Sequence, residues 1–225
     1  GNCGVGFAPV KPGTEEFLVQ LMEGVEDIPG VALNEGVSWD WESFPEYLDS
    51  IGKKNYAMDV GAMIGHGPIR SYVMGMDRCQ GKEEASDSEI DQMAEITKEA
   101  IEAGALGFST SRTYLHRDKF GEYVPGTEAT AKEMRKIANT IADLGQGTLE
   151  IVSDWMDQDI ELDWVKEFVE KSDRTLTYAQ TGGNPVETWK YCEENFSKGV
   201  KIRPQFPGRP TGMLFSLEST VHPFI

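Results

Sequence analysis

The chain has 225 residues, 39% of them hydrophobic, and a formal net charge of −17. Nucleic acids and anionic membranes bind basic patches, so this acidic balance excludes both as expected partners. No stretch approaches the ~20 apolar residues of a membrane span. The three cysteines are widely spaced and form neither a disulfide framework nor a CxxC site. We therefore expect a reducing, cytoplasmic location.

Apolar segments short enough to be strands recur along the chain, and most of them are rich in β-branched or aromatic residues. They are Tyr56–Ile64, Ala105–Ser109, Thr148–Ser153, Thr175–Ala179 and Val200–Phe206. The composition provides no linker between them, so we expect one domain.

The segments between these strands carry helix start signals. The signals are the capping boxes Ser86-x-x-Glu89 and Thr130-x-x-Glu133, the N-cap Asp159, and the pair Asn184-Pro185. Gly104 and Gly145 follow the first two helical patterns and predict their ends. Each strand is therefore expected to be followed by a helix.

This alternation predicts a parallel sheet covered by helices. Polar residues follow the strands, as at the carboxyl-end site of a (β/α)8 barrel. We expect an α/β fold, a partial TIM barrel over residues 1–225, with a doubly wound sheet as the alternative. The chain begins without Met and ends on apolar residues, so we expect a single catalytic barrel domain truncated at both ends.

Five residues are candidates for the site on their chemistry alone. Cys3 lies in a Gly-rich turn, where a thiolate can bind zinc or a thiol can be buried as a small apolar group. A glutamate inside a strand, Glu150, is costly unless it is paired or metal-bound. His66 and Gln180 follow strands. Arg112, in a long polar loop, suits a substrate carboxylate.

Several motifs, in this order, resemble the D-aminoacylase (N-acyl-D-amino-acid deacylase) branch of the amidohydrolase superfamily. They are Gly1-Asn2-Cys3-Gly4, Gly65-His66-Gly67-Pro68, Gly104-Ala105-Leu106-Gly107-Phe108-Ser109-Thr110 and Val124-Pro125-Gly126-Thr127. The resemblance covers most of the chain. It implies a metal-dependent (β/α)8 barrel that hydrolyses an amide through metal-activated water, with an Asp that moves the proton.

The resemblance also assigns residues. It makes Cys3 a metal ligand, and it places the first-strand HxH motif before Gly1 and the catalytic Asp after Ile225. The branch has metal-binding histidines on its fifth and sixth strands, but the corresponding strands here contain none. Glu150 stands near one of these positions. We therefore expect zinc, one or two ions in the full-length protein, with Cys3 and Glu150 as ligands.

The expected activity is hydrolysis of a non-peptide C–N bond in a small-molecule amide, with N-acyl-D-amino acids as the favoured substrates. Arg112, His66 and Gln180 are the expected substrate-binding residues. Hydrolysis of cyclic amides, as by hydantoinases, is the enzymatic alternative. The non-enzymatic alternative is a metal-free scaffold or binding protein. The sequence leaves the oligomeric state open.

Overall fold

The computed structural model describes residues 3–180, 186–206, 208 and 216–218. Within them, five strands form one parallel sheet in the order β1-β2-β3-β4-β5. The strands are β1 (Ile64–Gly65), β2 (Gly107–Arg112), β3 (Thr148–Ser153), β4 (Leu176–Ala179) and β5 (Ile202–Gln205). The parallel sheet is as predicted, and its order has no reversal of the kind that defines a doubly wound sheet. Closure into a barrel stays a prediction.

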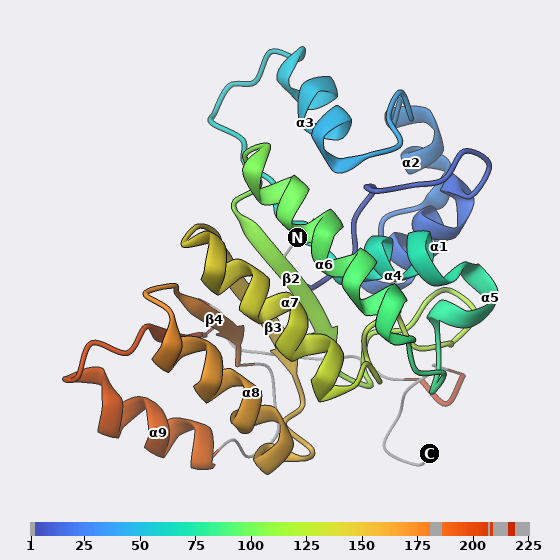
Figure 1. Ribbon diagram of the computed structural model, residues 1–225. Coiled ribbons are helices and arrows are strands. Elements are labelled where there is room, and N and C mark those ends of the chain that lie inside the picture. The colour runs from blue at the N-terminus through green and yellow to red at the C-terminus, as the bar shows by residue number, and fades with distance from the viewer. Residues whose placement is uncertain (1–2, 181–185, 207, 209–215, 219–225) are drawn as a thin grey trace.

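Nine helices accompany the described strands. They are α1 (Glu15–Glu26), α2 (Gly30–Gly36), α3 (Phe44–Gly52), α4 (His66–Met74), α5 (Met76–Cys79), α6 (Asp87–Glu102), α7 (Ala131–Leu144), α8 (Gln158–Lys171) and α9 (Val186–Phe196). Helices α6 to α9 lie side by side over one face of the sheet (Figure 1). None of the described helices is long and apolar enough to cross a membrane.

The first predicted strand is wrong over most of its length. Only Ile64, the last residue of the predicted segment, joins the sheet, and residues 56–63 form irregular chain. The side chains of Tyr56, Met58 and Val60 are exposed, so this apolar run is not buried by the fold. β2 also begins later than predicted, at Gly107, and extends to Arg112. The extension of β2 places Thr110, Ser111 and Arg112, which were predicted to lie in the loop after the strand, inside the sheet.

The helix caps follow the predictions in part. Ser86 and Glu89 form the complete capping box at the start of α6. Thr130 accepts the amide of Glu133 at the start of α7, but the Glu133 carboxylate leaves the cap for a buried ion pair. The N-cap of α8 is Asp157 rather than Asp159, because the Asp157 side chain accepts the amide of Ile160. The predicted cap Asn184-Pro185 lies outside the described residues.

The hydrophobic core lies between the sheet and these helices. Apolar stripes on α7 and α8 supply Met134, Ile137, Trp164 and Phe168, and the strands supply Phe108, Leu149, Ile151, Leu176 and Tyr178. Each of these side chains is fully buried, and a fully buried side chain of this size contributes roughly 1.5–3 kcal/mol. This buried layer holds the helices against the sheet. The strand register then determines on which face of the sheet each side chain lies.

Candidate functional site

The strand register divides the polar side chains between two faces of the sheet. Ser109, Glu150 and Thr177 are in register on β2, β3 and β4. Because side chains alternate along a strand, these three share one face, which we call the Glu150 face. Thr110 lies on the opposite face, which the helices cover and which we call the helix face. Candidate residues that adjoin in sequence are therefore separated by the sheet.

Glu150 carries a buried carboxylate on β3, and no described residue satisfies one of its oxygens. Glu150 is only 3% exposed. Its Oε1 atom has no hydrogen-bond partner among the described residues. Burial raises the pKa of Glu150 to about 7, because the charged form is poorly solvated there. A buried carboxylate oxygen without a donor calls for a cation or a proton, so this position fits the metal ligand that the sequence predicts.

Cys3 is buried beside a carboxylate that the sequence analysis did not identify. Its Sγ donates a hydrogen bond to Oε1 of Glu26, the last residue of α1, over 2.8 Å. Burial, and then this bond, raise the pKa of Cys3 to about 11, so the free thiol is protonated. The next residue, Gly4, has φ of +74°, and a Cβ there would lie 2.7 Å from the backbone nitrogen of Ser111. Only glycine lets the Cys3 turn approach β2 this closely.

A histidine that the sequence analysis did not select also lies near the carboxyl end of β2. His116 Nδ1 is 2.8 Å from Oγ of Ser111. Burial lowers the pKa of His116, although the charges of Glu26 and Asp154 oppose that shift. The imidazole is therefore neutral near pH 7 and lies within the electrostatic reach of Glu26, the partner of Cys3. Because the histidine is five residues beyond Ser111, only the course of the intervening loop brings them together.

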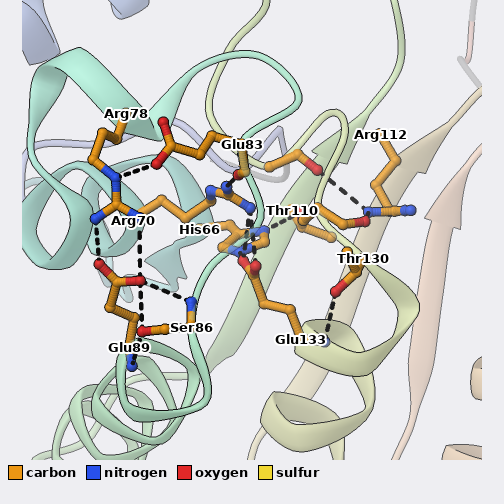
Figure 2. A network of polar contacts seen from close by, with 12 residues as sticks. His66, Arg70, Arg78, Glu83, Ser86, Glu89, Thr110, Arg112, Thr130 and Glu133 are labelled. Carbon is orange, nitrogen blue, oxygen red and sulfur yellow. Dashed lines mark hydrogen bonds and ion pairs between the residues drawn. The ribbon is translucent and has the colours of Figure 1, made fainter.

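His66 lies on the helix face, in a fully buried network (Figure 2). Its Nδ1 is 2.8 Å from Oγ1 of Thr110, and its Nε2 is 2.6 Å from Oε1 of Glu133. Arg70 donates from Nη1 to both carboxylate oxygens of Glu133, at 3.1 and 2.9 Å. Burial lowers the pKa of His66. Burial alone would raise the pKa of Glu133, but the bonds from His66 and Arg70 outweigh it and lower that pKa.

The structure places Arg112 on the helix face as well. Its Nε donates to Oε1 of Glu161 on α8 over 2.7 Å, and its Nη1 donates to the carbonyls of Gly126 and Ala129. Gln180 follows β4, and its Oε1 accepts the indole N–H of Trp189 over 3.1 Å. Arg112 and His66 thus share the face opposite to Glu150. This separation follows from the register, in which Arg112 and Glu150 have opposite parity.

A metal ion would find only part of a coordination shell in the described residues. No three of their His, Cys, Asp and Glu side chains are gathered closely enough to hold an ion. The orphaned oxygen of Glu150 and the thiol of Cys3 have the chemistry of zinc ligands. They fit as contributors to a site, and their sharing of one ion stays a prediction. Substrate binding by Arg112, His66 and Gln180 also stays a prediction.

Comparison with known proteins gives the family. The model of the amidohydrolase family matches residues 8–204. D-aminoacylase from Alcaligenes xylosoxydans xylosoxydans is 29% identical over 143 residues, which cover 63% of this chain and 24% of that protein. An uncharacterized protein of Mycobacterium tuberculosis strain H37Rv is 28% identical over 155 residues, with 65% and 24% covered. The chain thus spans about a quarter of the length of these relatives.

Among solved structures, a putative copper homeostasis protein, CutC from Streptococcus agalactiae, matches at 17% identity. The match covers 64% of this chain and 82% of that chain, and its TM-score is 0.22. This score is too low to support any conclusion on the fold. The family match rests instead on most of the chain, from Ala8 to Pro204, and includes every strand but the last residue of β5. The chain belongs to the amidohydrolase family.

Proposed function

We propose that the protein is a metal-dependent hydrolase of a non-peptide C–N bond, with N-acyl-D-amino acids as its favoured substrates. The observation that carries the proposal is the buried carboxylate of Glu150, whose Oε1 has no hydrogen-bond partner among the described residues, on the parallel sheet of a chain of the amidohydrolase family. The similarity to a D-aminoacylase supports the substrate class. The activity belongs to the whole protein, of which the described residues of this chain supply five strands and the helices that follow them.

Cys3 and Glu150 are the proposed metal ligands in this chain, and zinc is the proposed ion. When bound, the ion supplies the activation of water and the polarisation of the amide carbonyl. The chain contributes the placement of its ligands: Gly4 brings the Cys3 turn against β2, and the register of β3 fixes Glu150. Glu26 accepts the hydrogen bond from the Cys3 thiol, so its carboxylate is placed to take that proton when the thiolate forms.

The test compares two proteins: this 225-residue chain and the product of its complete reading frame. Each is purified with zinc, its metal content is determined by mass spectrometry, and turnover is measured on N-acetyl-D- and N-acetyl-L-amino acids. We expect bound zinc and D-selective turnover in the complete protein, and little or no turnover by the chain alone. The absence of both zinc and turnover from the complete protein would overturn the proposal in favour of a metal-free scaffold.

Two measurements refine this result. Turnover of hydantoins in place of N-acyl-D-amino acids would move the substrate class to cyclic amides. The substitution Glu150→Gln preserves side-chain size but removes the anionic ligand, so we expect it to lower both zinc content and turnover of the complete protein. Glu95→Gln is the matched control, because Glu95 is an exposed residue of α6 whose side chain pairs with the exposed neighbour Lys98.

A further inference from the structure

The connection from β2 to α7, residues 113–129, is an ordered structure fastened at its start. Oγ1 of Thr113 and the amide of Tyr114 donate to the two carboxylate oxygens of Asp154, at 2.6 and 2.8 Å. Further along, the amide of Val124 donates to the carbonyl of His116. The segment therefore folds back on itself beyond the carboxyl ends of β2 and β3. We call residues 113–129 the β2–α7 segment.

Three consecutive side chains of β2 contact this segment or the group that supports it. Ser111 points to the Glu150 face and bonds His116. Thr110 and Arg112 point to the helix face, where Thr110 bonds His66 and Arg112 donates to the carbonyls near the end of the segment. Because side chains alternate along β2, these three residues form hydrogen bonds on both faces of the sheet. Residues early and late in the segment are held by one strand.

His66 is the support against which the end of the segment packs. Gly126 has φ of +105°, and a Cβ at this glycine would lie 2.7 Å from Nδ1 of His66 and 3.3 Å from Oγ1 of Thr110. Glu133 holds the other ring nitrogen of His66, and Arg70 holds Glu133 (Figure 2). The imidazole therefore has no free rotation, and the glycine backbone rests directly on it.

The network itself is rigid for an electrostatic reason. The side chains of Arg70 and Glu133 are 2% and 0% exposed, and removing one partner of such a pair leaves an uncompensated buried charge, which is strongly destabilising. Arg70 also donates to the carbonyl of Glu83, which fixes its second nitrogen. A conformational change of His66 would therefore disturb charges that have no access to water.

We propose that His66 and Arg112 are positioning residues that hold the β2–α7 segment closed and thereby keep His116 on Ser111, the residue against which the Cys3–Gly4 turn packs. In this arrangement neither His66 nor Arg112 needs to touch substrate. That the β2–α7 segment is ordered follows from the contacts described above. The effect of this order on turnover rests on the proposed function. Substrate specificity would then depend on a segment whose supports lie behind the sheet.

The experiment measures hydrogen exchange of the complete protein by mass spectrometry, together with the pKa of His116 by NMR. The main variant, His66→Leu, removes both ring contacts. We expect the amide exchange rate of residues 113–129 to rise at least about tenfold relative to that of residues 148–153 of β3. The substitution makes local opening of the segment easier but leaves the opening of the sheet unchanged. The pKa of His116 should rise toward its ordinary value of about 6.5 as burial is lost.

Ser86→Ala is the control, because it removes the side-chain cap of α6 and lowers overall stability without touching residues 113–129. If His66→Leu raised the exchange rates of residues 113–129 and 148–153 equally, His66 would only support overall stability, and the proposal would be overturned. His66→Gln can restore a hydrogen bond, so it should recover part of the protection. Neither readout involves metal or substrate, so failure of the proposed activity would leave this result unaffected.

A second variant covers the case in which His66→Leu does not fold. Gly126→Ala leaves the network intact but places a methyl group against His66, so it should open the same segment and shift the pKa of His116 in the same direction. The wild-type protein supplies a third check. If its residues 113–129 exchange as fast as the irregular, exposed residues 53–61, the segment is not held closed and the proposal is wrong.

Discussion

Substituting Glu150 by Gln should remove a pH-dependent loss of stability that arises from the burial of this carboxyl. The wild-type carboxyl has a pKa of about 7 in the folded chain against 4.5 for an unperturbed glutamate. The folded state therefore binds the proton more tightly, and stability falls as pH rises through this interval. Gln cannot ionise, so the variant lacks this loss.

The magnitude follows from the two pKa values. Between pH 5 and pH 8 the wild-type chain should lose about 2.5 kcal/mol of unfolding free energy through this group alone. The buried amide of Gln carries its own cost of roughly 1–3 kcal/mol if its donors find no partner, but that cost does not vary with pH. The slope of the difference between wild type and variant is therefore the informative quantity, and other titrating groups cancel in it.

Urea unfolding of both proteins, followed by circular dichroism at pH 5, 6, 7 and 8 with a chelator present, measures this slope. We expect Glu150→Gln to gain about 2.5 kcal/mol relative to wild type from pH 5 to pH 8. Parallel curves would refute the reasoning, since they would mean that Glu150 is ionised at the same pH in both states. In the complete protein, zinc should raise the wild-type midpoint more than that of the variant, because an ion that binds only the folded state stabilises it.

Three further outcomes are expected, each by urea unfolding. Gly4→Ala should destabilise the chain by about 1–3 kcal/mol, because its Cβ would lie 2.7 Å from the Ser111 nitrogen at a φ of +74°; a loss under about 0.5 kcal/mol would contradict this close approach. Phe168→Ala should cost roughly 3–5 kcal/mol, since the ring is fully buried, whereas Phe196→Ala, at a ring position 68% exposed, should stay within about 0.5 kcal/mol. The lowered pKa of His66 means that the unfolded chain binds this proton more readily, so its contribution is fully present above about pH 6.5 and is lost as pH falls toward the folded pKa; a stability difference between wild type and His66→Leu that does not shrink below pH 6.5 would contradict this sign.

Local patterns in the sequence determined most of the sheet. The segment 148–153 is bounded by Gly147 and polar residues, and it forms β3 as predicted. Ser86 and Glu89 need only each other's backbone and side chains, so their capping box could be identified from spacing. The family resemblance likewise rested on short contiguous motifs, and the family match confirms it at the level of the amidohydrolases.

The first strand shows where a local pattern is insufficient. Tyr56 to Met63 is apolar enough for a strand, but a strand exists only where a neighbour supplies hydrogen bonds. β2 pairs with Ile64 and Gly65 alone. Tyr56, Met58 and Val60 stay exposed. Nearer to β1, Ala62 is partly buried and its carbonyl accepts the amide of Leu106, but this contact does not extend the strand.

The candidate site depended on tertiary structure throughout. Thr130-x-x-Glu133 has the spacing of a capping box, but the Glu133 carboxylate bonds His66 and Arg70 instead, 67 and 63 residues away, because a buried arginine needs a carboxylate more than the backbone amide of a helix cap does. The partnership of Cys3 with Glu26 also depends on how α1 packs against the turn. The sequence identified which residues have reactive chemistry, but strand register and helix packing decided which face each one occupies, since a one-residue step reverses the direction of a side chain.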